Sequence, residues 1–134
     1  MKAVAKLVLM ILLLTASVTY AQTKKSAEYL QFAKQKYLEA LDSDNHGVRN
    51  RTIFLVVCYK MQYPDDDLKP FLKKLHKMSQ TDPYLLNRIH GNVASMLLEN
   101  DALLQAVNPF DYDDQSVFFN KVYSVLSEKK LAAK

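Results

Sequence analysis

Apolar residues recur at three- and four-residue spacing along almost the whole of residues 26–130, and this helical period constrains the fold more than any other feature. The chain has only 2 glycines and 4 prolines, so few positions interrupt a helix. No segment shows the sustained apolar–polar alternation that is typical of a half-buried strand. The sequence therefore predicts an all-α domain of four to five amphipathic helices in antiparallel pairs.

Capping and turn residues set the expected helix limits. Pro70 fits only the first turn of its helix, because proline lacks the N–H that later turns need. Asp82 followed by Pro83 is a helix start signal, with the acid as the cap. The expected helices cover residues 26–41, 46–62, 66–78, 83–99 and 115–130, and one or two further turns lie within 102–107.

The apolar faces of these helices predict how they pack. The segment 46–62 is so apolar that we expect it at the centre of the domain, with neighbours on both sides. Its expected buried stripe is Val48, Thr52, Leu55, Val56 and Tyr59. In the segment 83–99 the expected buried face is Leu86, Ile89, Val93, Met96 and Leu97, and Gly91 predicts a close approach by a neighbouring helix. In the last helix we expect Phe118, Val122, Val125 and Leu126 to face inward.

Residues 1–21 have the layout of a secretory signal peptide. Lys2 and Lys6 precede an unbroken apolar run over 7–14, and Thr19-Tyr20-Ala21 offers a small-x-small cleavage site before Gln22. The run is too short to span a bilayer, which needs about 20 apolar residues. We expect a secreted or periplasmic protein that is cleaved after Ala21, with 22–134 as a single all-α domain that does not span a membrane.

Charge and cysteine content narrow the function classes. Two of the 18 basic residues belong to the leader, so 16 basic residues remain against 14 acidic ones. A balance this close to neutral does not favour nucleic acid as a partner. Cys58 is the single cysteine, so packing rather than an internal disulfide must stabilise the domain, and we expect Cys58 to be a buried apolar residue.

A faint repeat relates the two helix pairs. Asn50-Arg51 returns as Asn87-Arg88 at an offset of 37, and Tyr37-Leu38-x-x-Leu41 matches Phe71-Leu72-x-x-Leu75 at an offset of 34. Over about 26–99 this pattern resembles HEAT-like helical repeats, and the turn 42–49 resembles their inter-helix turn. The resemblance implies a binding scaffold without fixed chemistry. Two architectures remain open, a short HEAT-like stack and an irregular bundle of four or five helices.

No set of residues predicts catalysis, and no cofactor is expected. The segment 42–47 begins like a calcium loop, but Ile53 stands where a bidentate Glu is required, so we interpret it as a turn with Asp44 or Asn45 capping the next helix. The acidic segment 111–114 is interpreted as another helix cap. The histidines, His46, His76 and His90, lack zinc-ligand spacing, although His76 and His90 could meet if their helices pack antiparallel.

The best candidates for a binding site are basic side chains. Lys69, Lys73 and Lys77 form a stripe along one helix, interpreted as a solvated face or as a weak contact for anionic surfaces. Arg49, Arg51 and Arg88 would gather if the helices 46–62 and 83–99 lie side by side, in a groove suited to carboxylates.

We expect an exported protein-interaction scaffold or accessory subunit with an unknown protein partner, and no enzymatic activity. A continuous exposed apolar or arginine-lined face would favour this hypothesis. The alternative is a bundle that binds a small ligand or lipid in a cavity beneath the last helix. Its expected lining is Phe110, Tyr112, Phe118 and Phe119. A weaker third hypothesis is a metal-sensing or enzymatic domain built on the three histidines and the acidic turns.

Overall fold

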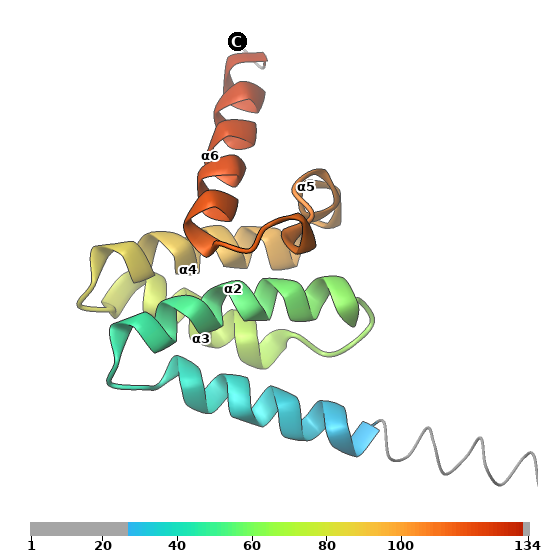
Figure 1. Cartoon of the computed structure of the whole chain (residues 1–134), viewed down its shortest axis with the longest axis vertical. Helices are drawn as coiled ribbons and strands as arrows, with labels where there is room; N and C mark the ends of the chain where they lie inside the picture. The colour runs from blue at the N-terminus through green and yellow to red at the C-terminus, as the bar shows by residue number, and fades with distance from the viewer. Residues whose placement is uncertain (1–26, 133–134) are drawn as a thin grey trace, which may run out of the picture. The chain divides into compact units, whose positions relative to one another are not determined.

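The computed structural model describes residues 27–132, and in these residues the all-α prediction is confirmed (Figure 1). The signal peptide, Gln22 and Ser26 lie outside the described residues. A first helix covers 27–41, and a 3-10 turn, η1, covers Pro109–Asp111. The other helices are α2 (His46–Gln62), α3 (Lys69–Thr81), α4 (Leu85–Glu99), the short α5 (Asp101–Ala106) and α6 (Gln115–Ala132). Successive helices pack as antiparallel neighbours, and the described part contains no strand.

The chain divides into two contact units between Lys36 and Tyr37. The described part of the first unit, 27–36, is helical and exposes Tyr29 and Phe32. The second unit begins at Tyr37 and contains α2 to α6, so the core and the candidate site described below belong to it. None of the described helices has an apolar stretch long enough to cross a bilayer.

Helix α2 forms the centre of the second unit. Residues on most sides of it are buried, and Ile53, Val56 and Val57 have no exposed surface. The expected stripe is wrong at Val48, which is exposed, and Leu55 is only half-buried. The helix begins after Asn45, whose side-chain oxygen accepts hydrogen bonds from the N–H groups of residues 47 and 48, so the predicted cap is confirmed. The buried residues of α2 are Arg49, Asn50, Thr52, Ile53, Phe54, Val56, Val57, Tyr59 and Lys60.

Helices α3 and α4 form a tight antiparallel hairpin. Pro70 lies in the first turn of α3, as predicted, and Phe71 and Leu75 are fully buried. The predicted close approach at Gly91 is also confirmed, because a Cβ there would lie 3.3 Å from the backbone oxygen of Leu75. The absence of a side chain at Gly91 thus allows the two helices to pack at short distance.

Helices α2 and α4 lie side by side and parallel (Figure 1). Near their N-terminal ends the Asn50 Nδ2 atom donates to Asn87 Oδ1 over 2.9 Å. Near their C-terminal ends the ammonium of Lys60, in the last turn of α2, lies 3.0 Å from a carboxylate oxygen of Asp101, which follows α4. The contact between Asn50 and Asn87 joins the two positions that the 37-residue offset related in the sequence.

The buried face of α4 differs from the prediction. Val93 and Leu97 are buried as expected, but Leu86, Ile89 and Met96 are exposed. The positions that contact α2 and α3 are instead occupied by residues with polar or small side chains, and these are Asn87, His90, Gly91, Ala94 and Ser95. The cap is also different, because Tyr84 is the residue that precedes the first turn and Asp82 lies two residues earlier.

Helix α6 rises steeply from α4 (Figure 1). Phe118, Phe119 and Val122 in its first turns are fully buried, whereas Val125 and Leu126 are only half-buried. A carboxylate oxygen of Asp114 accepts hydrogen bonds from the N–H groups of residues 116 and 117, which confirms the helix cap predicted in the segment 111–114. The base of α6 therefore completes the core, and its later turns extend beyond α4.

Candidate functional site

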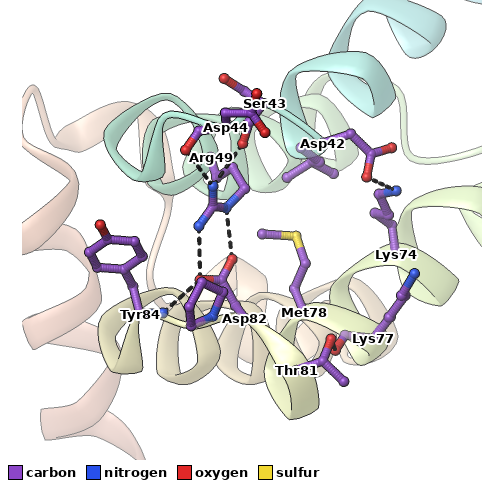
Figure 2. Close-up of a pocket in the computed structure, with 12 residues that line it drawn as sticks. Asp42, Ser43, Asp44, Arg49, Lys74, Lys77, Met78, Thr81, Asp82 and Tyr84 are labelled. Atoms are coloured by element: carbon purple, nitrogen blue, oxygen red, sulfur yellow. Dashed lines mark hydrogen bonds and ion pairs between the residues drawn. The ribbon is translucent and has the colours of Figure 1, made fainter.

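Arg49 and Asp82 form a buried ion pair that joins the start of α2 to the turn between α3 and α4. The Nε and Nη2 atoms of Arg49 donate to the two carboxylate oxygens of Asp82 over 2.8 and 3.0 Å (Figure 2). The remaining guanidinium nitrogen donates to the backbone oxygens of Ser43 and Asp44. Burial opposes ionisation of Asp82, but hydrogen bonds from Arg49, Tyr84 and Asn87 outweigh it and lower the pKa of the carboxyl.

Asp82 does not cap α4, because its carboxylate is engaged by Arg49. Its carboxylate is oriented toward Arg49 and reaches only the N–H of Tyr84, over 2.9 Å. The same carboxylate lies 3.4 Å from the side-chain nitrogen of Asn87. Asp82, which the sequence predicted as the cap of one helix, therefore contacts side chains of both α2 and α4.

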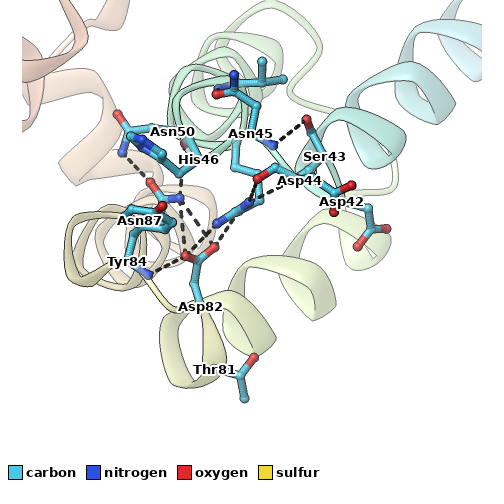
Figure 3. Close-up of polar contacts among 12 residues, drawn as sticks. Asp42, Ser43, Asp44, Asn45, His46, Asn50, Thr81, Asp82, Tyr84 and Asn87 are labelled. Atoms are coloured by element: carbon cyan, nitrogen blue, oxygen red, sulfur yellow. Dashed lines mark hydrogen bonds and ion pairs between the residues drawn. The ribbon is translucent and has the colours of Figure 1, made fainter.

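A second group of polar side chains next to this ion pair connects α2, α4 and α6, and Figure 3 shows two of its members, Asn50 and Asn87. The Asn50 Nδ2 atom contacts both Asn87 Oδ1 and His90 Nδ1 at 2.9 Å. The Asn50 oxygen accepts a 2.6 Å hydrogen bond from Gln115 Nε2. Asn87 also donates to the backbone oxygen of His46 over 3.2 Å. We call the side chains of Asn50, Asn87, His90 and Gln115 the amide network.

His90 is the titratable member of the amide network. Its ring is buried and stacks on Phe119, with the ring centroids 3.9 Å apart. Burial lowers the pKa of His90 to about 4, so the ring is neutral near neutral pH. Since the Asn50 Nδ2 atom can only donate, His90 Nδ1 accepts, and the ring proton is assigned to Nε2.

A cavity of about 350 Å³ opens beside the ion pair, between the turn 42–44 and the end of α3 (Figure 2). Two of its cations are already engaged, because Arg49 pairs with Asp82 and the Lys74 ammonium contacts the carboxylate of Asp42. The predicted stripe residue Lys77 also lines this cavity. The lining thus mixes opposite charges and suits a polar, zwitterionic group better than a simple anion.

A second cavity, of about 330 Å³, lies over the amide network at the start of α4. Its walls are mostly apolar, and His46 stacks on Tyr84 at one side with the ring centroids 4.1 Å apart. Leu85 and Leu86 expose more than half of their surface next to it. The lining residues are His46, Gly47, Asn50, Tyr84, Leu85, Leu86, Asn87 and Gln115.

An exposed apolar surface continues from this cavity along α4. Leu85, Leu86, Ile89 and Met96 are 61, 54, 37 and 38% exposed, and we call these four residues the α4 apolar face. Leu85, Ile89 and Met96 lie on the side of α4 opposite the residues that pack against α2 and α3, whereas Leu86 lies in the first turn, where it borders the cavity. Several large apolar side chains exposed on one helix are typical of interaction sites.

The predicted arginines have three different environments. Arg49 is buried and paired with Asp82, whereas Arg51 is exposed with its guanidinium carbon 5.0 Å from the ring centroid of Phe54. Arg88 is half-buried on α4. The helices that carry them do lie side by side, but Arg49 faces inward, away from any external carboxylate.

The predicted lysine stripe is present on α3, where Lys69, Lys73 and Lys77 are all exposed. Lys74 lies off this stripe and is half-buried against Asp42.

The other expected groups are separated in the fold. Phe118 and Phe119 are fully buried core residues that contact each other, and Phe118 also contacts Phe54. Neither lines the two cavities described above, and Phe110 is exposed. His76 lies on the surface of α3, 3.6 Å from Glu99, whereas His90 faces the interior. In the described residues no three His, Cys, Asp or Glu side chains gather as metal ligands. Cys58 is half-buried rather than fully buried, and desolvation raises the pKa of its thiol.

The sequence did not predict the contacts that Asp82, Asn87 and Gln115 make between helices. A signal for Asn87 was available, because Asn50 and Asn87 occupy equivalent positions of two otherwise apolar helices. No comparable local signal marks Gln115, whose partner Asn50 is 65 residues away. Comparisons with protein families, with curated proteins and with solved structures gave no match for this chain.

Proposed function

We propose that the protein is an exported binding module that acts through protein–protein contact, with the α4 apolar face as its contact surface. The observation that carries this proposal is the exposure of four large apolar side chains on one helix whose opposite side is fixed by buried polar contacts. Because α4 is held by the amide network and by close packing at Gly91, the surface is rigid before a partner arrives. A preorganised surface loses less conformational entropy on binding.

The cavity at the start of α4 supports the same role. A volume of about 330 Å³ is at the small end of ligand pockets, and it could accept one large apolar side chain of a partner. Its mouth is bordered by Leu85 and Leu86, so such an anchor would be continuous with the α4 apolar face. The same cavity supports the second candidate function, in which a small apolar ligand binds without a protein partner.

The test is an affinity pull-down with the exported protein as bait, from the extracytoplasmic fraction of its own source. We expect a stoichiometric protein partner that is lost with Ile89→Asp and with Leu86→Asp. Val117→Asp is the matched control, because Val117 is an apolar residue on α6 that is at least as exposed as Leu86 and Ile89. Circular dichroism of each variant checks that the helices remain folded.

Two results would refute this role. One is a partner that is captured equally well by the Ile89→Asp variant, since binding would then use another surface. The other is co-elution of a small molecule with no protein, which would favour the ligand-binding alternative instead.

A further inference from the structure

Building on the protein-binding role proposed above, we infer that the partner of the α4 apolar face is a second copy of this chain. The two α4 helices would pack antiparallel about a two-fold axis that passes close to Asn92. The inference combines three observations. These are the row of apolar side chains on α4, the two charged residues along the edge of that row, and the position of the α3 lysines on the far side of α4.

The apolar side chains lie in one row along α4, with the exposed Asn92 between Ile89 and Met96. Leu85, Ile89 and Met96 are spaced at i, i+4 and i+11, so at 100° per residue they lie within about 40° of one another around the helix. The row is about 16 Å long at 1.5 Å per residue. An isologous dimer requires a surface that is complementary to itself. If the axis passes between Asn92 and residue 93, Ile89 of one copy lies opposite Met96 of the other.

The charges at the edge of this row favour the antiparallel arrangement. Arg88 and Glu99 are 11 residues apart, so they lie within about 20° of each other on the same edge of the row. A two-fold axis perpendicular to the helices places the charged edge of one copy next to the charged edge of the other. The two edges then run in opposite directions. Measured along the helix axis, the offset between Arg88 of one copy and Glu99 of the other is then about 3 Å.

Neither of these side chains is committed to a strong partner. Arg88 is half-buried and forms no ion pair with any other described residue. Glu99 is exposed, and its one charged contact within residues 27–132 is the exposed His76, at 3.6 Å. Two opposite-charge pairs would form per dimer. A parallel arrangement would instead place the charged edges of the two copies on opposite sides of the interface, so neither Arg88 nor Glu99 would meet the other copy's charged edge.

The lysine stripe on α3 does not oppose this arrangement. Gly91 marks the side of α4 that meets α3, and it lies about 160° around the helix from Ile89. Lys69, Lys73 and Lys77 are therefore set back from the contact, where salt screens their repulsion over about 8 Å. Three apolar residues per copy form a small interface, so we expect a reversible dimer with a dissociation constant of about 10 μM or weaker.

The experiment is sedimentation velocity of the exported protein from about 1 μM to about 500 μM, the range in which a weak dimer changes its population. We expect a shift from monomer to dimer that Ile89→Asp abolishes and the control Val117→Asp leaves unchanged. Arg88→Glu alone and Glu99→Arg alone should each weaken dimerisation about tenfold, because like charges then face each other twice. The double variant Arg88→Glu/Glu99→Arg restores opposite pairing, so it should dimerise like the parent.

A protein that stays monomeric over this whole range would overturn the inference. So would a dimer that Ile89→Asp does not affect, or a double charge-swap variant that remains as weak as the single variants. Capture of a different protein through the α4 apolar face by a strictly monomeric chain would overturn self-association and leave the protein-binding role intact.

Discussion

Acid should destabilise this domain through a single buried histidine. The pKa of His90 is lowered by burial from 6.5 to about 4 in the folded protein, so the unfolded chain takes up a proton at higher pH than the folded one does. The stability that His90 contributes is fully present above pH 6.5, falls as the pH decreases toward 4, and changes no further below that pH. The pKa of Asp82 is also lowered, but its ordinary value is 3.8, so its effect begins below this window.

The magnitude follows from the size of the shift. A difference of one pKa unit corresponds to about 1.4 kcal/mol, so protonation of His90 in the unfolded chain should remove about 3 kcal/mol of stability by pH 4. A domain of this size has a free energy of unfolding of about 5–15 kcal/mol. The expected loss is thus large enough to measure by urea unfolding at pH values of about 7 and about 4.5, followed by circular dichroism.

His90→Asn is the informative variant. The asparagine oxygen can accept the hydrogen bond that Asn50 donates to His90 Nδ1, but it does not titrate in this range. We expect the variant to be less stable at neutral pH, because it loses the stacking on Phe119, and to show no loss between pH 6.5 and pH 4. His76→Asn is the control on the surface of α3 and should retain the parent's pH dependence. A His90→Asn variant that retains the full pH dependence would refute the assignment.

Three further predictions concern stability and reactivity. Asp82→Asn should lower the free energy of unfolding by about 3–5 kcal/mol in urea titrations, because Arg49 would remain buried without a counter-charge; a loss below about 1 kcal/mol would contradict the role of this pair. Gly91→Leu should lower it by about 2 kcal/mol or more by forcing α3 away from α4, and unchanged stability would mean that the helices are not closely packed there. Cys58 should react with a thiol reagent severalfold more slowly in the native protein than in urea, since it is half-buried and its pKa is raised; equal rates would exclude this protection.

Much of the fold could be predicted from the sequence because helix limits depend on nearby residues. Pro70 can only occupy a first turn, and Asn45 and Asp114 accept hydrogen bonds from N–H groups two or three positions ahead. The apolar character of the segment 46–62 likewise placed α2 at the centre. These features involve residues within about one helical turn, so they hold whatever the helix later packs against.

The tertiary structure alone decided which side of α4 is buried and what its buried side chains do. By apolarity, Leu86, Ile89 and Met96 should face the core, but the neighbours of α4 provide hydrogen-bond partners for Asn87 and His90. A buried polar side chain is tolerated only where a specific partner meets it, and here that partner, Asn50, is 37 and 40 residues away. Local periodicity carries no information about such partners, so the exposed face of α4, and with it the candidate binding surface, emerged only when the helices were assembled.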